Sequence, residues 1–445
     1  MTTTHLTARQ GVAYGLLGLP LAFVALPLYV HLPNFYATEY GMSLATLGAV
    51  LLFTRLLDAL TDPFLGRFGD YLHRRSVRAV LAAGGVCAVL LVVGMAGLFG
   101  PPDAVSGSPT ELVVWVSLGL LVTYTTFSLL SIAHQSWGAR LGGDELYRAR
   151  VVAWREAAGL IGVVMASVLP ALLGWNAWLA AFALTLGLGW LAWTRAPQPE
   201  RPEAQAAREA AALQPGAEAL PLWDSLRLPW TRPAFRRLMA VFVLSGMGSA
   251  IPATLVLFFI KDRLLVPEME PAFLATYFVC AAASIPLWLR LVKRWGLART
   301  WLAGMLLAIS VFGWTATLGA GDHWYFLVVC ALSGIALGTD LALPSALLAG
   351  VIGQQKGDSG RYEGAYFGWW NLAAKLNLAL AAGLALPFLG AMGYQPGTTD
   401  PEGLRALALV YAVLPCILKL MAAGLLYVAI IRPQPFSTPP LKEST

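Results

Sequence analysis

Three ionisable residues stand in a stretch that is otherwise apolar. Arg55, Asp58 and Asp62 are three and four residues apart within the run 53–63. On a helix this spacing places them within roughly 60° of one another on one face. Two carboxylates one turn apart can together ligate a monovalent cation or share a proton, and Arg55 can neutralise one of them when the ion leaves. A structural ion-pair network near the helix end is the alternative.

Two further charges lie near the middles of apolar runs. Asp340 falls in the run 324–350 and Lys375 in the run 364–390. A charge at the centre of a membrane helix costs at least about 2.5–3.5 kcal/mol unless it is paired or hydrated, so both side chains are expected to face the interior. They either neutralise each other in a fixed salt bridge, or Lys375 moves between a substrate and the Asp58 and Asp62 pair.

A polar and aromatic cluster ends another apolar run at residues 131–137. His134, Gln135 and Trp137 offer hydrogen-bond donors, acceptors and a stacking surface suited to an organic solute, although a histidine and a tryptophan at a membrane interface are often anchors. Asn371 precedes Lys375 by one helical turn. The expectation is that one cavity is lined by Gln135, Trp137, Asp340, Asn371 and Lys375. The glycines at 364 and 368 favour close helix packing instead of a substrate role.

The elements that carry these residues are membrane spans. Of the 445 residues, 58% are hydrophobic and only 12% are charged, about half the charge of a soluble surface. The apolar runs are roughly 20 residues long, the length that crosses a hydrocarbon core of about 30 Å. The fold class predicted is therefore an all-α membrane protein with about twelve spans. These are 11–36, 44–65, 79–99, 111–135, 151–174, 175–194, 238–260, 272–290, 300–319, 324–350, 364–390 and 403–431.

The spans divide into two groups of six. Residues 1–194 form the first half, 195–237 a cytoplasmic linker with one short helix expected at Arg201–Leu213, 238–431 the second half, and 432–445 a cytoplasmic tail. Lys and Arg concentrate in alternate loops, which basic residues keep on the cytoplasmic side. Both termini are therefore predicted to face the cytoplasm.

Charge and cysteine content narrow the classes of function. The net charge of +6 comes from residues in short loops between apolar runs, which indicates topology determinants and argues against a nucleic-acid partner. The four cysteines all fall in apolar runs without paired spacing, so neither a disulfide framework nor a zinc site is expected. The short polar start of the chain predicts that no signal peptide is removed.

The segment that follows the second span resembles a family signature. Gly66, Asp70, Arg74 and Arg75 stand in Gly-Arg-Phe-Gly-Asp-Tyr-Leu-His-Arg-Arg, which is similar to the loop motif of the major facilitator superfamily. With the preceding run from Arg55, the chain resembles the glycoside–pentoside–hexuronide:cation symporter family. The similar stretches extend over nearly the whole chain and include 147–156, 361–368 and 393–396.

This resemblance implies a function and roles for the charged residues. Asp58 and Asp62 match the cation-site carboxylates, Arg55 the arginine beside them, and Lys375 the lysine linked to coupling. The chain is thus expected to be a secondary active symporter that moves a small organic solute, such as a sugar or glycoside, with Na⁺ or H⁺ by alternating access. Sugar-transporting members carry acidic residues in helices one and four, where this chain has Leu21, Ala22 and Ser131, so a less polar or anionic solute is the alternative.

Proteins of other classes are weaker candidates. A membrane-embedded enzyme needs a nucleophile with a base or a metal constellation, and the five histidines are scattered along the chain. A substrate-sensing receptor needs a signalling domain, for which the linker is short. We therefore expect a monomeric transporter of a bacterial-type inner membrane that is not an enzyme and needs no cofactor. Its partners are a small-molecule substrate, the lipid bilayer and the coupling ion.

Overall fold

Helices make up the regular structure of the protein. The computed structural model describes residues 6–24, 27–28, 32–42, 44–199, 221–353, 362–395 and 397–433, and these ranges contain helices and no strand. Eight helical segments among them are long and apolar enough to cross a bilayer. The predicted class of an all-α membrane protein is confirmed. The short linker helix expected at residues 201–213 lies outside the described ranges.

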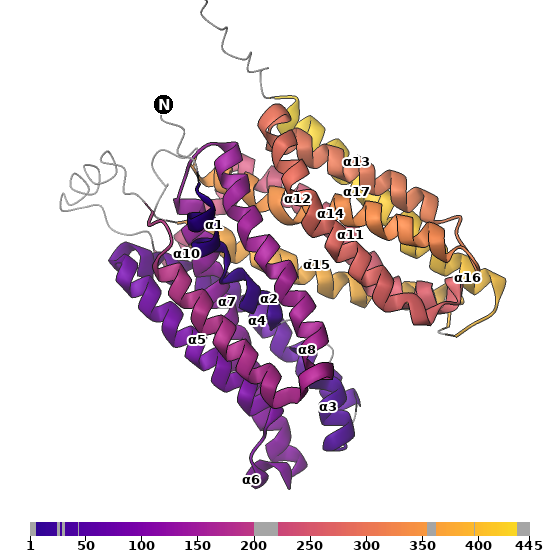
Figure 1. Ribbon diagram of the computed structural model, residues 1–445, viewed down its shortest axis with the longest axis horizontal. Helices are drawn as coiled ribbons and strands as arrows, with labels where there is room; N and C mark the ends of the chain where they lie inside the picture. The colour runs from indigo at the N-terminus through magenta and orange to yellow at the C-terminus, as the bar shows by residue number, and fades with distance from the viewer. Residues whose placement is uncertain are drawn as a thin grey trace, which may run out of the picture. The chain divides into compact units, whose positions relative to one another are not determined.

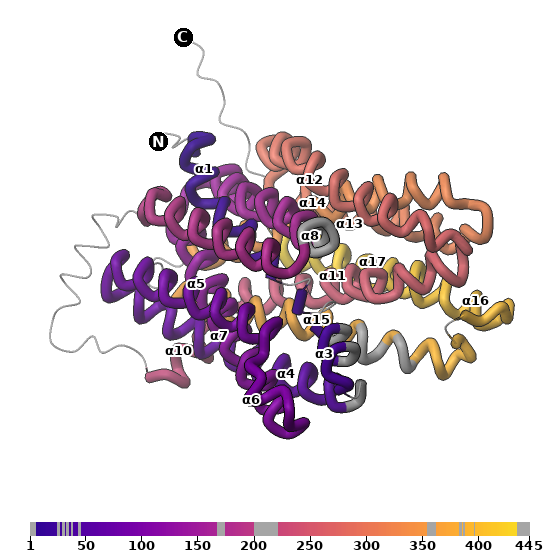
Figure 2. The backbone as a smooth tube through the Cα atoms, turned by 60° about the horizontal axis from the view of Figure 1, so that its bottom comes forward, coloured from indigo at the N-terminus to yellow at the C-terminus, as the bar shows by residue number. Residues whose placement is uncertain are grey.

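The first compact unit comprises Met1–Pro229 and Ala349–Lys375. Within it α1 and α2 pack on α8, while α4 and α5 pack on α7. Figures 1 and 2 both show α5 and α7 running side by side. Its helices are α1 (Ala8–Gly15), α2 (Gly18–Phe23), α3 (Leu32–Glu39), α4 (Leu44–Arg75), α5 (Val77–Phe99), α6 (Asp103–Ser106), α7 (Pro109–Arg140), α8 (Glu145–Thr194) and α10 (Leu222–Thr231).

The second compact unit comprises Trp230–Leu348 and Leu376–Thr445. Here α17 packs on α11 and α13, and α12 packs on α13. Its elements are α11 (Pro233–Phe258), η2 (Phe259–Leu264), η3 (Pro267–Met269), α12 (Glu270–Trp295), α13 (Leu297–Thr315), α14 (His323–Gly353), α15 (Glu363–Ala391), α16 (Pro401–Ala408), η4 (Leu409–Val413), α17 (Leu414–Leu426) and η5 (Tyr427–Ile431). Both α14 and α15 contribute to the two units, since residues 349–375 belong to the first.

Within the described ranges the predicted spans lie mainly on helices, but their bounds differ. The first span is divided among α1, α2 and α3, and the break expected between the fifth and sixth lies inside α8 at Gly174, whose φ of 76° is not helical. The interval 66–78 between the second and third predicted spans is helical apart from Ser76, because α4 continues to Arg75 and α5 begins at Val77. Helices extend past the apolar core into water, where charged residues remain helical. Hydropathy alone therefore ends them too early.

Polar side chains mark where the helices begin. The Ser76 hydroxyl accepts a hydrogen bond from the backbone N–H of Ala79 at the start of α5, and Asp144 does the same for Tyr147 at the start of α8. Such caps satisfy backbone donors that have no partner inside the helix. The sharp turn between α4 and α5 therefore needs only one residue outside a helix.

The loop after α15 is fixed to the end of the π-helical turn η2. The Tyr394 hydroxyl and the Gly397 backbone N–H both donate to the carboxylate of Asp262, which is 6% exposed. Burial and the hydrogen bond to Asp262 raise the pKa of Tyr394 above its ordinary value, so its hydroxyl stays a donor. Tyr394 of the sequence motif thus has a structural role.

Candidate functional site

Helix α4 separates an apolar face from an acidic one. Leu56 and Leu60 are 48% and 53% exposed, whereas Asp58 and Asp62 are 3% and 0% exposed. Exposed leucines suit a surface that contacts lipid, and buried carboxylates require partners inside the protein. The face predicted from the spacing of the charges is therefore turned into the first unit.

The partner of both carboxylates is Lys375 on α15. Its Nζ lies 2.6 Å from Oδ2 of Asp58 and 2.8 Å from Oδ2 of Asp62. Ser128 on α7 accepts a hydrogen bond from the same ammonium at 2.8 Å and donates one to Asp58 Oδ1 at 2.8 Å. Arg55 lies over the ring of Tyr124, 5.9 Å from its centroid. One ammonium thus faces two carboxylates in a nearly dry site.

A polar strip continues along the same two helices. Gln135 follows Ser128 by two turns on α7, and Asn371 precedes Lys375 by one turn on α15. The side-chain amide of Gln135 donates to Ser131 Oγ at 2.9 Å and to the Asn371 side-chain oxygen at 3.4 Å. These groups are half-buried, so hydrogen-bonding atoms remain accessible to a solute. Gln135, Asn371 and Lys375 are predicted to line one cavity, and these three lie on one strip in the structure.

Asp70 anchors the first turn of α15. Its carboxylate, 0% exposed, accepts hydrogen bonds from the backbone N–H groups of Gly364 at 2.6 Å and Ala365 at 3.0 Å. Arg140 at the end of α7 bonds Asp70 at 2.8 Å and Glu363 at 2.9 Å. A carboxylate at a helix N-terminus satisfies unpaired donors and suits the helix dipole. The motif aspartate is therefore a structural anchor in this structure.

The glycines of the motif allow α4 and α15 to touch. A Cβ at Gly66 would lie 2.0 Å from the carbonyl oxygen of Gly364, and a Cβ at Gly368 would lie 2.6 Å from that of Asp62. The expected packing role of Gly364 and Gly368 is confirmed by these contacts. Arg74 and Arg75 end α4, where positive charge suits the carbonyl end of a helix.

His134 and Trp137 lie in the core of the first unit. His134 is 0% exposed, its Nε2 lies 2.9 Å from the backbone oxygen of Tyr14, and the two rings are 4.4 Å apart. Trp137 donates to the backbone oxygen of Pro197 at 2.9 Å and packs edge-on against Trp193. The solute contacts expected for His134 and Trp137 are therefore wrong for this structure, because burial leaves neither ring accessible.

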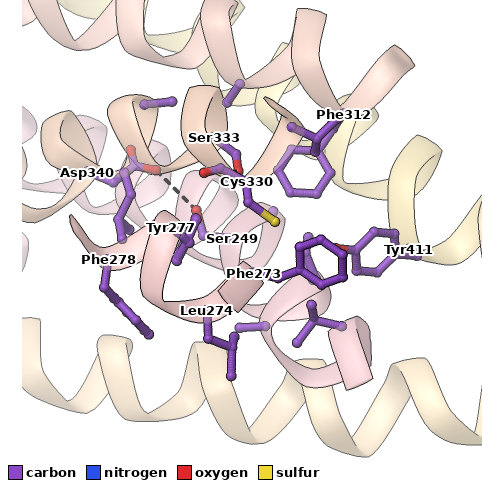
Figure 3. Close-up of a pocket in the computed structure, with 18 of the residues that line it drawn as sticks. Ser249, Phe273, Leu274, Tyr277, Phe278, Phe312, Cys330, Ser333, Asp340 and Tyr411 are labelled. Atoms are coloured by element: carbon purple, nitrogen blue, oxygen red, sulfur yellow. Dashed lines mark hydrogen bonds between the residues drawn. The ribbon is translucent and has the colours of Figure 1, made fainter. Parts of the chain in front are cut away.

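The ion-pair partner of Asp340 is Lys419. Asp340 lies in the second unit, where Lys419 Nζ is 2.6 Å from its Oδ2. The Ser249 hydroxyl donates a hydrogen bond to Asp340 at 3.1 Å, and the Trp301 indole donates another at 2.8 Å. Figure 3 shows the bond from Ser249. Asp340 and Lys375 belong to different units, Asp340 to the second and Lys375 to the first. Sequence reasoning missed Lys419, although a lysine inside the last predicted span is itself a signal.

The arrangement in the first unit can exchange cations. Two carboxylates share one ammonium here, with the Arg55 guanidinium close enough to interact with both, so a proton or a monovalent metal ion can compete with Lys375 for the same oxygens. Hydroxyl and amide groups beside them suit a solute rich in hydroxyl groups. The site has the chemistry for linked binding of a cation and a polar solute.

Known proteins share both the sequence pattern and the fold. Residues 11–431 match the family model described as MFS/sugar transport protein. The uncharacterized symporter YjmB of Bacillus subtilis (strain 168) is 22% identical, with 96% of this chain and 93% of that protein covered. The putative glycoside/cation symporter YagG of Escherichia coli (strain K12) is 21% identical, with 93% and 90% covered.

A solved structure supports the same architecture. The crystal structure of a bacterial homologue of the iron transporter ferroportin in an outward-facing state has a TM-score of 0.70 at 16% identity, and the match covers 95% of this chain and 99% of that one. At this identity the likeness concerns the fold. Because the family model covers nearly the whole length, the chain belongs to the MFS/sugar transport protein family.

Proposed function

We propose that this protein is a cation-coupled symporter of small, sugar-like solutes. The observation that carries the proposal is the contact of Lys375 with both Asp58 and Asp62 in a buried site. The names of the two relatives, a symporter and a putative glycoside/cation symporter, support coupling to a cation and a hydroxyl-rich solute over the less polar or anionic alternative.

The coupling step exchanges one positive charge for another. A Na⁺ ion or a proton that binds Asp58 and Asp62 releases the Lys375 ammonium, because both compete for the same oxygens. The released side chain and the Gln135 and Asn371 amides then offer donors to solute hydroxyl groups. Cation binding thereby raises the affinity for solute, and by linkage solute raises the affinity for the cation.

The test separates coupling from transport. Asp58→Asn removes one of the two charges while keeping the size of the side chain. We expect this variant in proteoliposomes to lose concentrative uptake driven by a Na⁺ or proton gradient and to retain exchange of labelled solute at equal concentrations. Asp103→Asn, a change at an exposed residue of α6, is the matched control. Unchanged concentrative uptake in Asp58→Asn refutes the coupling role.

The orientation is also part of the proposal. We place two six-helix halves, residues 1–194 and 238–431, in a bacterial-type inner membrane as a monomer, with both termini and the linker in the cytoplasm. Reporters fused after Arg75, within 201–213 and after Arg432 are expected to report the cytoplasm. A periplasmic signal from the linker fusion contradicts the two-halves arrangement.

A further inference from the structure

A cavity of about 160 Å³ lies inside the second unit, apart from the proposed coupling site. It is lined by residues of α11, α12, α13, α14, η4 and α17. An apolar cavity of about 150 Å³ is known to hold one benzene ring. The space therefore fits a single six-membered ring.

The walls favour an aromatic occupant. Phe273, Phe312, Phe326 and Tyr411 line the cavity, and Figure 3 shows Phe273, Phe312 and Tyr411 together at the end opposite Asp340. Phe273 and Phe326 already meet edge-on, with centroids 4.9 Å apart. Aromatic rings prefer such offset or edge-on contacts, which add to the gain from burial.

The charged end of the cavity favours an uncharged ligand. Asp340 and Lys419 neutralise each other at 2.6 Å, and Asp340 also accepts from Ser249 and Trp301. A charged ligand has to break this pair or remain unpaired in a partly dry site, which is costly. A neutral ligand leaves the pair intact.

Two tyrosines line the same space. Within the described part of the chain, the hydroxyls of Tyr277 and Tyr411 have no hydrogen-bond partner in the protein, although both residues line the cavity. A polar group of this kind gains a bond when a ligand brings a hydroxyl group. The walls thus provide polar contacts beside the apolar ones.

We propose that this cavity binds an uncharged, hydroxylated aromatic ring. The inference goes beyond the proposed symport and does not depend on it, because binding to the cavity requires neither Asp58, Asp62 nor a cation gradient. A solute of this class occupies the second unit with its ring among the phenylalanines. Its hydroxyl groups bond Tyr277 and Tyr411.

The experiment measures binding of resorcinol to the full-length purified protein by ligand-observed NMR, in the absence of a cation gradient. We expect saturable binding of resorcinol. Cyclohexane-1,3-diol, which has the same hydroxyl groups on a non-aromatic ring, should bind at least 10-fold more weakly. The 3-hydroxybenzoate anion should not compete with resorcinol. Equal binding of the diol or the anion overturns the proposal, as does the absence of saturable resorcinol binding to the wild-type protein.

Variants tie the binding to the cavity. Ala336→Phe fills the space from α14 and should abolish resorcinol binding, whereas Val328→Phe, at a 46% exposed position of the same helix, should not. Tyr277→Phe and Tyr411→Phe keep the volume and should each weaken binding by about 2- to 10-fold, the value of one hydrogen bond. Wild-type affinity in both tyrosine variants, or in a folded Ala336→Phe protein, places the ligand elsewhere and refutes the proposal. Asp103→Asn, at an exposed residue of the first unit, should leave resorcinol binding unchanged.

Discussion

Replacing Lys375 with methionine removes the one ammonium that contacts both Asp58 and Asp62. The three groups together carry one net negative charge when ionised, and the variant leaves two, both nearly inaccessible to water. Removing one partner of a buried pair costs about 3–5 kcal/mol, because the remaining charge is uncompensated. We therefore expect the free energy of unfolding to fall by about this amount at neutral pH in the absence of Na⁺.

Removing one carboxylate charge should restore part of the lost stability. Combining Lys375→Met with Asp62→Asn returns the site to one negative charge, so at least half of the loss should be recovered. A bound proton or Na⁺ should act in the same direction, and the loss should shrink as pH falls or Na⁺ is added. Chemical unfolding in mixed micelles, with choline replacing Na⁺ and pH varied separately, measures each effect.

A surface substitution provides the control. Lys261→Met changes an exposed lysine of η2 and should alter the free energy of unfolding by no more than about 0.5 kcal/mol. The explanation is refuted if Lys375→Met is as stable as Lys261→Met. It also fails if the double variant is no more stable than Lys375→Met alone.

Two further predictions concern contacts that the motifs provide. Gly66→Ala should separate α4 from α15 and lower both thermal stability and uptake. Gly69→Ala is the control, because a Cβ there meets no atom within 4 Å, and it should raise the free energy of unfolding by up to about 1 kcal/mol. Similar effects of the two substitutions would contradict the packing role. Tyr394→Phe should cost about 1.5–3 kcal/mol by removing a donor to the Asp262 carboxylate, whereas Tyr427→Phe, at a 51% exposed position, should cost nothing measurable in the same unfolding assay.

Sequence patterns predict the all-α membrane class because the bilayer imposes a length and a composition on each helix that crosses it. Charge position also identified the buried residues, since an unpaired charge cannot remain in lipid. The partner of each charge was harder to predict. The sequence allows Lys375 to pair with Asp340 or with Asp58 and Asp62, and only packing decides between them. The pairing of Lys419 with Asp340 depends on packing in the same way.

The residue types of His134 and Trp137 suggest a solute site, but packing decides whether their side chains are accessible. A histidine and a tryptophan near a helix end are equally compatible with a solute site and with a core. The imidazole of the buried His134 bonds the backbone oxygen of Tyr14 and lies tilted against its ring, a partner 120 residues earlier in the chain. No local pattern records a contact over that separation.

The first thirteen residues of α15, Glu363–Lys375, behave as a peptide ligand that is covalently tethered to its receptor. Polar anchors hold the segment at both ends, Asp70 at its start and the Asp58 and Asp62 pair about 18 Å further along, and the glycines lie between them. A tether gives such a ligand a high effective concentration. On the proposed function, Lys375 is then a built-in competitive inhibitor of cation binding. Weakening the distant anchor at Asp70 should therefore tighten the apparent affinity for the cation without a change in any residue that the cation touches.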